Sequence, residues 1–235
     1  MLRILALIPA RAGSQGLANK NLQRIGRRTL LAQAVTLALA SRRRGEHWDV
    51  VVSTESHRYA VHARRAGAEV PFLRPARLAS HRARLIDVVK HTLVTLSEAG
   101  RQYDAVLLLS ATTPLTSVRD VRHALQLFRK RGQAVVSVTK EQHPDNWRFA
   151  LAHGQLISLA GETRIGRRQE SPPRYRLNGA LYLASPAWLS ENGQFVKSGR
   201  TTPLVLPKSR SLDIEDNLDL QIAKVMKLHC PTQLP

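Results

Sequence analysis

Short apolar runs alternate with amphipathic segments along the first 140 residues of the chain. The apolar runs are rich in Val, Leu, Ile or Ala and lack polar alternation, which is typical of strands buried on both faces of a parallel sheet. The segments between them carry apolar residues at helical spacing. The pattern predicts strands at 4–8, 50–53, 105–109 and 134–138 and helices at 30–41, 58–66, 85–99 and 120–131. It therefore predicts an α/β fold in which helices flank a mostly parallel sheet.

The alternation stops after Lys140. The next stretch contains prolines, tryptophan and the short run 155–158, which indicate hairpins and loops, and then a strand at 180–184. The chain returns through residues 212–214 to a final amphipathic helix. We predict one domain over residues 1–235, in which residues 140 to about 202 form an inserted lobe.

Composition narrows the class of protein. The chain has 235 residues, 43% of them hydrophobic, which is enough for one substantial core. No run approaches the roughly 20 apolar residues of a membrane helix, and the apolar start is followed by Pro9 and Arg11, unlike a secretory signal. The single cysteine, Cys230, cannot form an internal disulfide and fits a reducing compartment. We expect a cytoplasmic protein without a membrane span.

The charge is strongly positive. Lys and Arg number 36 against 17 Asp and Glu, which gives a formal net charge of +19. Such an excess attracts polyanions, so nucleic acid is a partner to consider. The cations are dispersed in small groups, however, without zinc-ligand spacing or an aromatic RNA-binding pattern. The sequence permits a nucleic-acid partner but does not favour one, and most of these charges are expected to be solvated.

The first predicted strand runs into a loop that contains Arg11, Gly13, Ser14, Gly16 and Lys20. Glycines allow backbone N–H groups to curl around anionic oxygens, and the cations and the hydroxyl add further phosphate donors. Ligands of such folds bind at the carboxyl edge of the sheet. The loop is neither a Walker A motif nor a GxGxxG fingerprint, so an ordinary strand-to-helix turn with surface cations stays open as an alternative.

Residues 8–16, followed by Lys20 and Asn21, resemble the opening motif of the CMP-sugar synthetases, which comprise the acylneuraminate and, more distantly, the Kdo cytidylyltransferases. The resemblance extends over nearly the whole chain. It implies a Rossmann-like fold and the transfer of CMP from CTP to the anomeric hydroxyl of an acidic, sialic-acid-like sugar, with release of pyrophosphate. It also implies a set of nucleotide-binding residues, namely Arg11, Gly13, Ser14, Gln15, Gly16, Lys20, Asn21, Arg74, Ser110 and Thr112.

The chain departs from this family pattern at several places near the nucleotide. Gln15 stands where the family usually has lysine, which removes one cation that would face the phosphates. Glu55 replaces an aspartate, and Ser110 replaces a glutamine associated with the base. Further replacements are His81 for an acid, Arg84 for a serine and Thr116 for an arginine. Base selection is therefore less firmly implied than nucleotidyl transfer.

The predicted lobe carries the residues that resemble the family's sugar-binding segment. They are Arg168, Gln169 and Asn178, with Tyr182 close by. A guanidinium can pair bidentately with a sugar carboxylate, and an amide can both donate to and accept from hydroxyls. Asn178 and Gly179 could instead form a plain hairpin turn. In the resembled family this lobe also pairs subunits, so a homodimer is implied.

Two acidic side chains stand near the end of the chain. Asp213 and Glu215 flank Ile214, and in an extended segment residues two apart point to the same face. Together with phosphate oxygens they would suit Mg²⁺. The resembled family has Asp-Ile-Asp here as its metal-binding pair, so the resemblance implies a metal-binding role for Asp213 and Glu215. The candidate catalytic residues are Asp213, Arg11 and Lys20. Asp216 and Asp219 are expected to serve the start of the last helix instead.

Two alternatives stay open. The acceptor could be a different acid, such as Kdo, a pseudaminic- or legionaminic-type sugar, or a phosphonate. The chain could also be a non-catalytic nucleotide- or polyanion-binding homologue, since its departures gather in the nucleotide half. The sequence indicates no general base.

Overall fold

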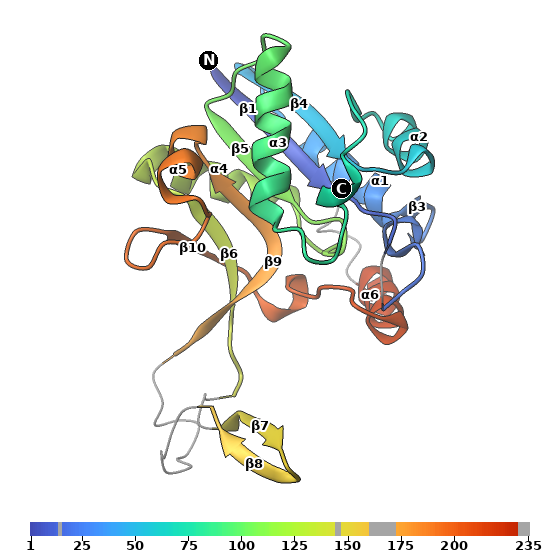
Figure 1. The fold of residues 1–235 in the computed structure, drawn as a ribbon, viewed down its shortest axis with the longest axis vertical. Helices are drawn as coiled ribbons and strands as arrows, with labels where there is room; N and C mark the ends of the chain where they lie inside the picture. The colour runs from blue at the N-terminus through green and yellow to red at the C-terminus, as the bar shows by residue number, and fades with distance from the viewer. Residues whose placement is uncertain (14–15, 144–146, 160–172, 230–235) are drawn as a thin grey trace.

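The computed structural model describes residues 1–13, 16–143, 147–159 and 173–229. At its centre lies a six-stranded sheet with the strand order β10-β6-β9-β5-β1-β4 (Figure 1). β1 runs parallel to β4 and β5, β10 runs parallel to β6, and β9 is antiparallel to both of its neighbours. The strands are β1 (Leu2–Pro9), β4 (Glu46–Ser53), β5 (Ala105–Leu109), β6 (Val135–Lys140), β9 (Tyr175–Ala184) and β10 (Thr202–Val205). The predicted α/β class with a mostly parallel sheet is confirmed.

Helices cover both faces of this sheet, as Figure 1 shows. Alternate residues of β1 enter two separate cores: Ile4 and Ile8 pack on one face, and Leu5 and Leu7 pack on the other. The first face is covered by α1 (Leu30–Ala40), α2 (His57–Arg65) and α4 (Val118–Arg131). The second face is covered by α3 (Leu85–Glu98) and α5 (Pro186–Asn192). Because both faces are buried, the strands show continuous apolar runs without alternation.

Local sequence signals set the ends of these helices. Ser117 accepts a hydrogen bond from Asp120 N, and the Asp120 carboxylate accepts one from Ser117 N, which forms a reciprocal capping box at the start of α4. The helix ends at Gly132, which adopts a left-handed conformation with φ of 64°. The predicted helix at 120–131 therefore begins two residues earlier in the structure, at Val118.

A third, smaller core joins the ends of the chain. The final helix, α6 (Asn217–His229), packs against the two-stranded ribbon of β2 (Arg24–Ile25) and β3 (Arg28–Thr29). The buried residues of this core are Ile25, Leu30, Ile214, Leu220 and Ala223. The segment that carries Asp213 and Glu215 is thereby held next to the loop that follows β1.

A hairpin of β7 (Phe149–Ala152) and β8 (Gln155–Ser158) projects away from the sheet at the bottom of Figure 1. The range that we predict as an inserted lobe, 140 to about 202, contains this hairpin, but it also contains β9 and α5, which pack within the central cores. The sequence pattern did not identify β9 as a central strand. In the part of the chain that the structure describes, no helix has the length and apolar character to cross a membrane.

Candidate active site

A cavity of about 500 Å³ opens at the carboxyl ends of the neighbouring parallel strands β1 and β5. Its size falls within the range of ligand pockets, and its position is where nucleotides bind in open α/β sheets. Most of its lining comes from the loops after β1 and β5, from residues 74–88 and from β9. The predicted site residues that line it are Arg11, Gly16, Lys20, Asn21, Arg74, Ser110, Thr112, Tyr182 and Glu215.

The loop after β1 contributes the first two cations of the cavity. The side chain of Asn21 donates from Nδ2 to the Arg11 carbonyl oxygen at 3.1 Å, which ties the two ends of the loop together. Asn19, in a left-handed conformation with φ of 49°, turns the chain into the short 3₁₀ helix η1 (Lys20–Leu22). Lys20 is thereby held at the cavity wall, and its side chain is only 14% exposed.

The remaining predicted residues of this loop are placed differently. Gly13 does not belong to the cavity lining, and no atom lies within 4 Å of the position of a Cβ there. Ser14 and Gln15 lie outside the described residues. Their predicted phosphate contacts stay predictions.

Arg74 is the third cation of the cavity. It is held in place by Glu55, a residue for which the sequence predicted no role. Glu55, just after β4, accepts a hydrogen bond from Ala12 N at 2.7 Å and one from Arg74 Nη2 at 2.8 Å. Burial by itself raises the pKa of Glu55, but the bonds from Ala12 and Arg74 outweigh it and hold the pKa below its ordinary value. Glu55 is therefore a charged carboxylate that joins two parts of the cavity wall.

Two hydroxyl groups line the cavity after β5. Ser110 Oγ and Thr112 Oγ1 lie 2.9 Å apart, and Thr112 N donates to Ser110 Oγ at 3.2 Å. The Thr112 carbonyl accepts from Ile214 N at 2.9 Å, and the Thr112 side chain also forms a hydrogen bond with Asp213. These bonds attach the loop after β5 to the acidic segment near the end of the chain.

Asp213 lies half-buried against the middle of β9. A Cβ added to Gly179, which has φ of +73°, would be 3.2 Å from Asp213 Oδ2. Burial raises the pKa of Asp213, and the charge of Glu215 raises it further, whereas Thr112 and Lys20 lower it. Burial, with the nearby charge of Asp213, also raises the pKa of Tyr182.

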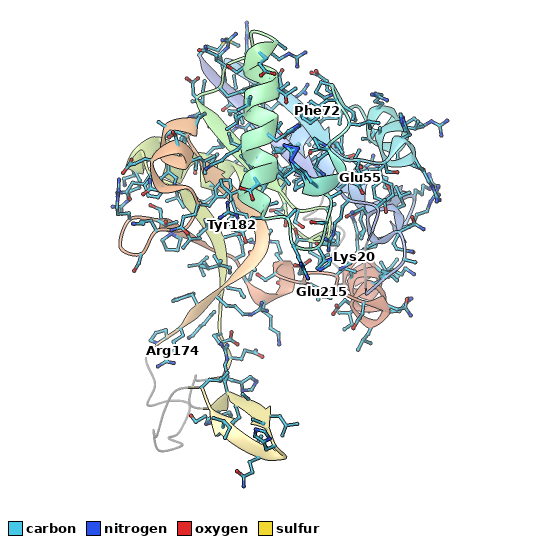
Figure 2. All side chains as sticks on the ribbon, viewed as in Figure 1. Lys20, Glu55, Phe72, Arg174, Tyr182 and Glu215 are labelled. Carbon is cyan, nitrogen blue, oxygen red and sulfur yellow. The ribbon has the colours of Figure 1, made fainter. Side chains whose placement is uncertain are left out.

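Glu215 faces the opposite loop. Its Oε2 lies 3.9 Å from Lys20 Nζ, and Figure 2 shows the two side chains next to each other below the sheet. Asp216 and Asp219 do not share in this contact, because they bond to each other's backbone and to Glu215 N at the start of α6. Their predicted structural role is confirmed.

Asp213 and Glu215 are suited to holding a divalent cation. Both supply carboxylate oxygens, and the negative charge of Glu215 helps to raise the pKa of Asp213, as expected of two carboxylates that lie near each other. No group of three or more His, Cys, Asp or Glu side chains with metal-binding geometry occurs within the described ranges. A cation here would therefore need further ligands, which phosphate oxygens can supply.

Asn178 is placed differently from Tyr182, the other predicted sugar-binding residue that the structure describes. It is buried and is not part of the cavity lining. Its Oδ1 accepts from Ser137 Oγ at 2.6 Å and from Ala180 N at 3.2 Å, and its Nδ2 donates to Ser211 Oγ at 2.9 Å. The amide is thus engaged by the protein at both ends and supports the segment that leads to Asp213, and its predicted contact with the sugar stays a prediction.

The remaining residues singled out from the sequence have different outcomes. Arg168 and Gln169 lie outside the described residues. His81 lines the cavity, whereas Arg84 does not and pairs instead with Asp87 through two hydrogen bonds of 3.0 and 2.9 Å.

The sequence analysis also did not predict an ion pair that fixes the chain just before the acidic segment. Arg210 forms two hydrogen bonds with the Asp120 carboxylate, at 2.9 and 3.0 Å. This pair lies at the start of α4 and holds the chain three residues before Asp213. No local sequence pattern links two positions so far apart along the chain. The available signal was the acidic residue at the start of a helix, which can pair with a basic side chain from elsewhere in the fold.

Comparison with known proteins agrees with the nature of this site. Residues 5–167 match the family model described as cytidylyltransferase. A CMP-N,N'-diacetyllegionaminic acid synthase of Legionella pneumophila is 35% identical over 97% of this chain and 98% of its own length. An N-acylneuraminate cytidylyltransferase of Escherichia coli is 31% identical over 94% of this chain and 51% of its own length.

Solved structures share the fold at low sequence identity. A CMP:2-keto-3-deoxy-manno-octonic acid synthetase complexed with CTP superposes with a TM-score of 0.70 at 15% identity, over 97% of this chain and 99% of that one. A 4-diphosphocytidyl-2C-methyl-D-erythritol synthase superposes with a TM-score of 0.64 at 15% identity, over 96% of this chain and 99% of that one.

Proposed function

The chain belongs to the cytidylyltransferase family, and from this premise we propose that it transfers CMP from CTP to the anomeric hydroxyl of an acidic sugar and releases pyrophosphate. One observation carries the proposal. Three cations converge on one cavity at the carboxyl edge of the sheet: Arg11 and Lys20 from the loop after β1, and Arg74 from the segment between α2 and α3. A triphosphate is the ligand whose charge and length match such a set.

The reaction is an in-line displacement at the α-phosphorus of CTP. The bond from the anomeric oxygen to phosphorus forms while the bond from phosphorus to the bridging oxygen breaks. Pyrophosphate leaves with the electron pair of the broken bond, and the hydroxyl proton is lost to solvent. Arg11 and Lys20 would stabilise the negative charge that gathers on the leaving group. Because little covalent chemistry is required of the protein, most of the catalysis would come from positioning and charge neutralisation.

Asp213 and Glu215 would hold Mg²⁺. When bound, this ion would neutralise charge on the phosphates during transfer. Asp213 is the better-fixed of the two ligands, since Gly179 and Thr112 confine its carboxylate. Glu215 has a side chain that is 78% exposed and would be oriented by Lys20.

The acceptor is proposed to be a sialic-acid-like sugar acid. Two of the similar proteins are described as acting on N-acylneuraminate and on N,N'-diacetyllegionaminic acid, and both cover nearly all of this chain. Tyr182 lies on the cavity wall beside Asp213 and is suited to contact the sugar. Kdo, pseudaminic-type sugars and phosphonates are the competing acceptors.

Release of pyrophosphate from CTP tests the proposal. The purified chain would be supplied with CTP, Mg²⁺ and separately with N-acetylneuraminic acid, a legionaminic-type acid, a pseudaminic-type acid and Kdo. We expect turnover with at least one of the first three and less with Kdo. Pyrophosphate release with none of them, while CTP still binds, would favour the non-catalytic alternative.

A matched pair of lysine variants localises the activity. Lys20→Met is expected to lower kcat/KM on the order of 100-fold, as for other donors that stabilise charge in the transition state. Lys130→Met, which makes the same change on the exposed last turn of α4, serves as the control and should leave kcat/KM within about 2-fold, as for most surface changes. Equal effects of the two changes would show that the loop after β1 is not the phosphate site.

We also propose that the chain forms a homodimer through the β7–β8 hairpin. Exposed apolar side chains gather on this hairpin: Leu151 is 77% exposed and Leu156 is 68% exposed. A projecting apolar hairpin is a typical interaction surface. Light scattering should give twice the monomer mass for the unaltered chain and the monomer mass for the double variant Leu151→Asp, Leu156→Asp. A monomeric unaltered chain at micromolar concentration would contradict the proposal.

A further inference from the structure

The contacts of Glu55 extend the proposed function to a residue outside the cavity lining. Glu55 lies at the end of β4, which neighbours β1 in the sheet, and Figure 2 labels its side chain. One carboxylate oxygen accepts from Ala12 N in the loop after β1, at 2.7 Å. The other accepts from Arg74 Nη2, at 2.8 Å. One side chain therefore connects the phosphate loop to the cavity arginine.

Arg74 depends on this carboxylate for its charge balance. Its side chain is 4% exposed, so water screens the guanidinium little, and Glu55 is the ion-pair partner that the described residues provide. The backbone of the arginine is held separately, by the bond from Arg74 N to the Thr54 carbonyl at 2.8 Å. Glu55 thus governs where the guanidinium points and leaves the path of the chain to other contacts.

The guanidinium is not saturated by the protein. Its Nε is buried and has no hydrogen-bond partner among the described residues. Arg74 nevertheless belongs to the cavity lining. A buried arginine with one side fixed by a carboxylate and donors still unused is the arrangement expected of a cation held ready for an anionic ligand.

We propose that Glu55 is a positioning residue for nucleotide binding, which acts by holding the Arg74 guanidinium and the Ala12 N–H of the phosphate loop in the geometry that receives the triphosphate of CTP. The proposal rests on the proposed function. Glu55 itself does not touch the nucleotide in this arrangement, because both of its carboxylate oxygens are directed at protein donors.

Whether removal of Glu55 weakens or tightens CTP binding distinguishes a positioning role from a purely electrostatic effect. A carboxylate beside a triphosphate site repels the ligand, so removal of its charge alone should tighten CTP binding. If Glu55 positions Arg74, its removal should instead weaken binding, because the buried guanidinium loses its fixed orientation. A purely structural role would lower the melting temperature and leave the affinity of the folded protein for CTP unchanged.

The test is a double-mutant cycle on CTP affinity, measured by calorimetry with the full chain. Glu55→Gln keeps an oxygen for Ala12 N but cannot accept from Arg74 as a charged partner. We expect it to raise the Kd for CTP about 10-fold, equivalent to about 1.4 kcal/mol. In the Arg74→Met background the same change should alter Kd by less than about 2-fold, because the residue through which Glu55 acts is gone.

Two further variants complete the design. Glu69→Gln removes a carboxylate that pairs with Arg101 outside this cavity, and it should leave Kd unchanged. Glu55→Asp keeps the charge but is one methylene shorter, and it should bind CTP with an affinity between those of Glu55→Gln and the unaltered chain. This conservative variant also supplies the comparison if Glu55→Gln does not fold.

The outcomes separate this inference from the proposed function. Tighter or unchanged CTP binding by Glu55→Gln, or an equal effect of the change with and without Arg74, would overturn the positioning role while the unaltered enzyme still turns over CTP. Failure of the unaltered chain to bind CTP would overturn both. The role of Glu55 is supported if Glu55→Gln weakens CTP binding in the unaltered chain and does not weaken it further in the Arg74→Met background.

Discussion

Gly16 in the first loop and Glu215 near the end of the chain are in such close contact that a Cβ on Gly16 would lie 2.5 Å from the Glu215 carbonyl oxygen. Real Cβ atoms do not approach backbone oxygens so closely, and a backbone atom cannot swing aside as a side chain can. The contact therefore requires glycine at position 16. It also sets the distance between the loop that carries Lys20 and the segment that carries Asp213.

The first prediction concerns this contact. Gly16→Ala is expected to lower the free energy of unfolding by about 2 kcal/mol, as for other overpacked sites, because the loop and the segment must separate. Gly13→Ala is the matched control, since nothing lies within 4 Å of a Cβ there, and it should change stability by less than about 0.5 kcal/mol. Denaturant titration measures both, and equal losses would show that the close approach is absent in solution.

The second prediction compares two glycines with the same backbone angle. Gly179 and Gly199 both have φ of +73°, but only at Gly179 would a Cβ meet a neighbour, Asp213 Oδ2 at 3.2 Å. Gly199→Ala should cost about 1 kcal/mol from backbone strain alone. Gly179→Ala should cost more and should also lower kcat/KM, because Asp213 must move by a few tenths of an ångström. Identical stability losses with full activity in Gly179→Ala would contradict the confinement of Asp213.

The third prediction concerns the charge of Asp213. Because the pKa of this group is raised in the folded protein, the folded state binds its proton more tightly than the unfolded state does. The stabilising effect of protonation is complete below the ordinary aspartate pKa and is lost as the pH rises through the raised value. Asp213→Asn, which stays uncharged, should therefore be more stable than the unaltered chain at neutral pH without divalent cations.

Activity and stability should move in opposite directions for Asp213→Asn. The variant is expected to lose nearly all pyrophosphate release, since the amide is a poor ligand for Mg²⁺. Thermal unfolding in a chelating buffer from pH 4 to pH 8 measures the stability difference, which should shrink toward acid pH. A variant that is less stable than the unaltered chain at neutral pH would contradict the pKa assignment.

The fourth prediction concerns a buried ion-pair cluster away from the cavity. The Glu46 side chain is 5% exposed and binds both Arg122, which is 8% exposed, and Arg129, which is 48% exposed. Arg122→Met should lower the free energy of unfolding by about 3 kcal/mol, as for a broken buried pair. Arg129→Met, the exposed counterpart, should cost about 0.5 kcal/mol. Equal losses of unfolding free energy in the two variants would indicate that burial does not strengthen the ion pair of Arg122 with Glu46.

The same cluster should respond to acid. Burial by itself raises the pKa of Glu46, but hydrogen bonds from Arg122, Trp48 and Arg129 outweigh it, so the pKa is lowered on balance. A depressed carboxyl pKa gives stability that is present above the ordinary glutamate pKa and lost as the pH falls through the lowered value. Glu46→Gln should therefore be less stable than the unaltered chain at neutral pH and lose this difference in acid, with turnover of CTP unaffected.

Elements whose signals are local could be predicted from the amino-acid sequence. The buried strands were predicted because continuous apolar runs reflect burial on both faces, and the helices were predicted because their apolar spacing follows the helical period. The sequence predicted Arg11 and Lys20 at a ligand site because their loop leaves a strand at the carboxyl edge of the sheet, and both residues line the cavity.

Features that depend on partners far apart along the chain could be identified only in the folded protein. The position of β9 at the centre of the sheet, antiparallel to β5 and β6, follows from pairing between segments that are far apart along the chain. Asn178 was expected at the acceptor, but its burial beside Ser137 and Ser211 directs its amide inward. Glu55 acquires its bonds to Ala12 and Arg74 only when three loops meet. Local propensity and periodicity report how a residue sits on its own element, whereas hydrogen bonds across the fold depend on packing that no short stretch of sequence contains.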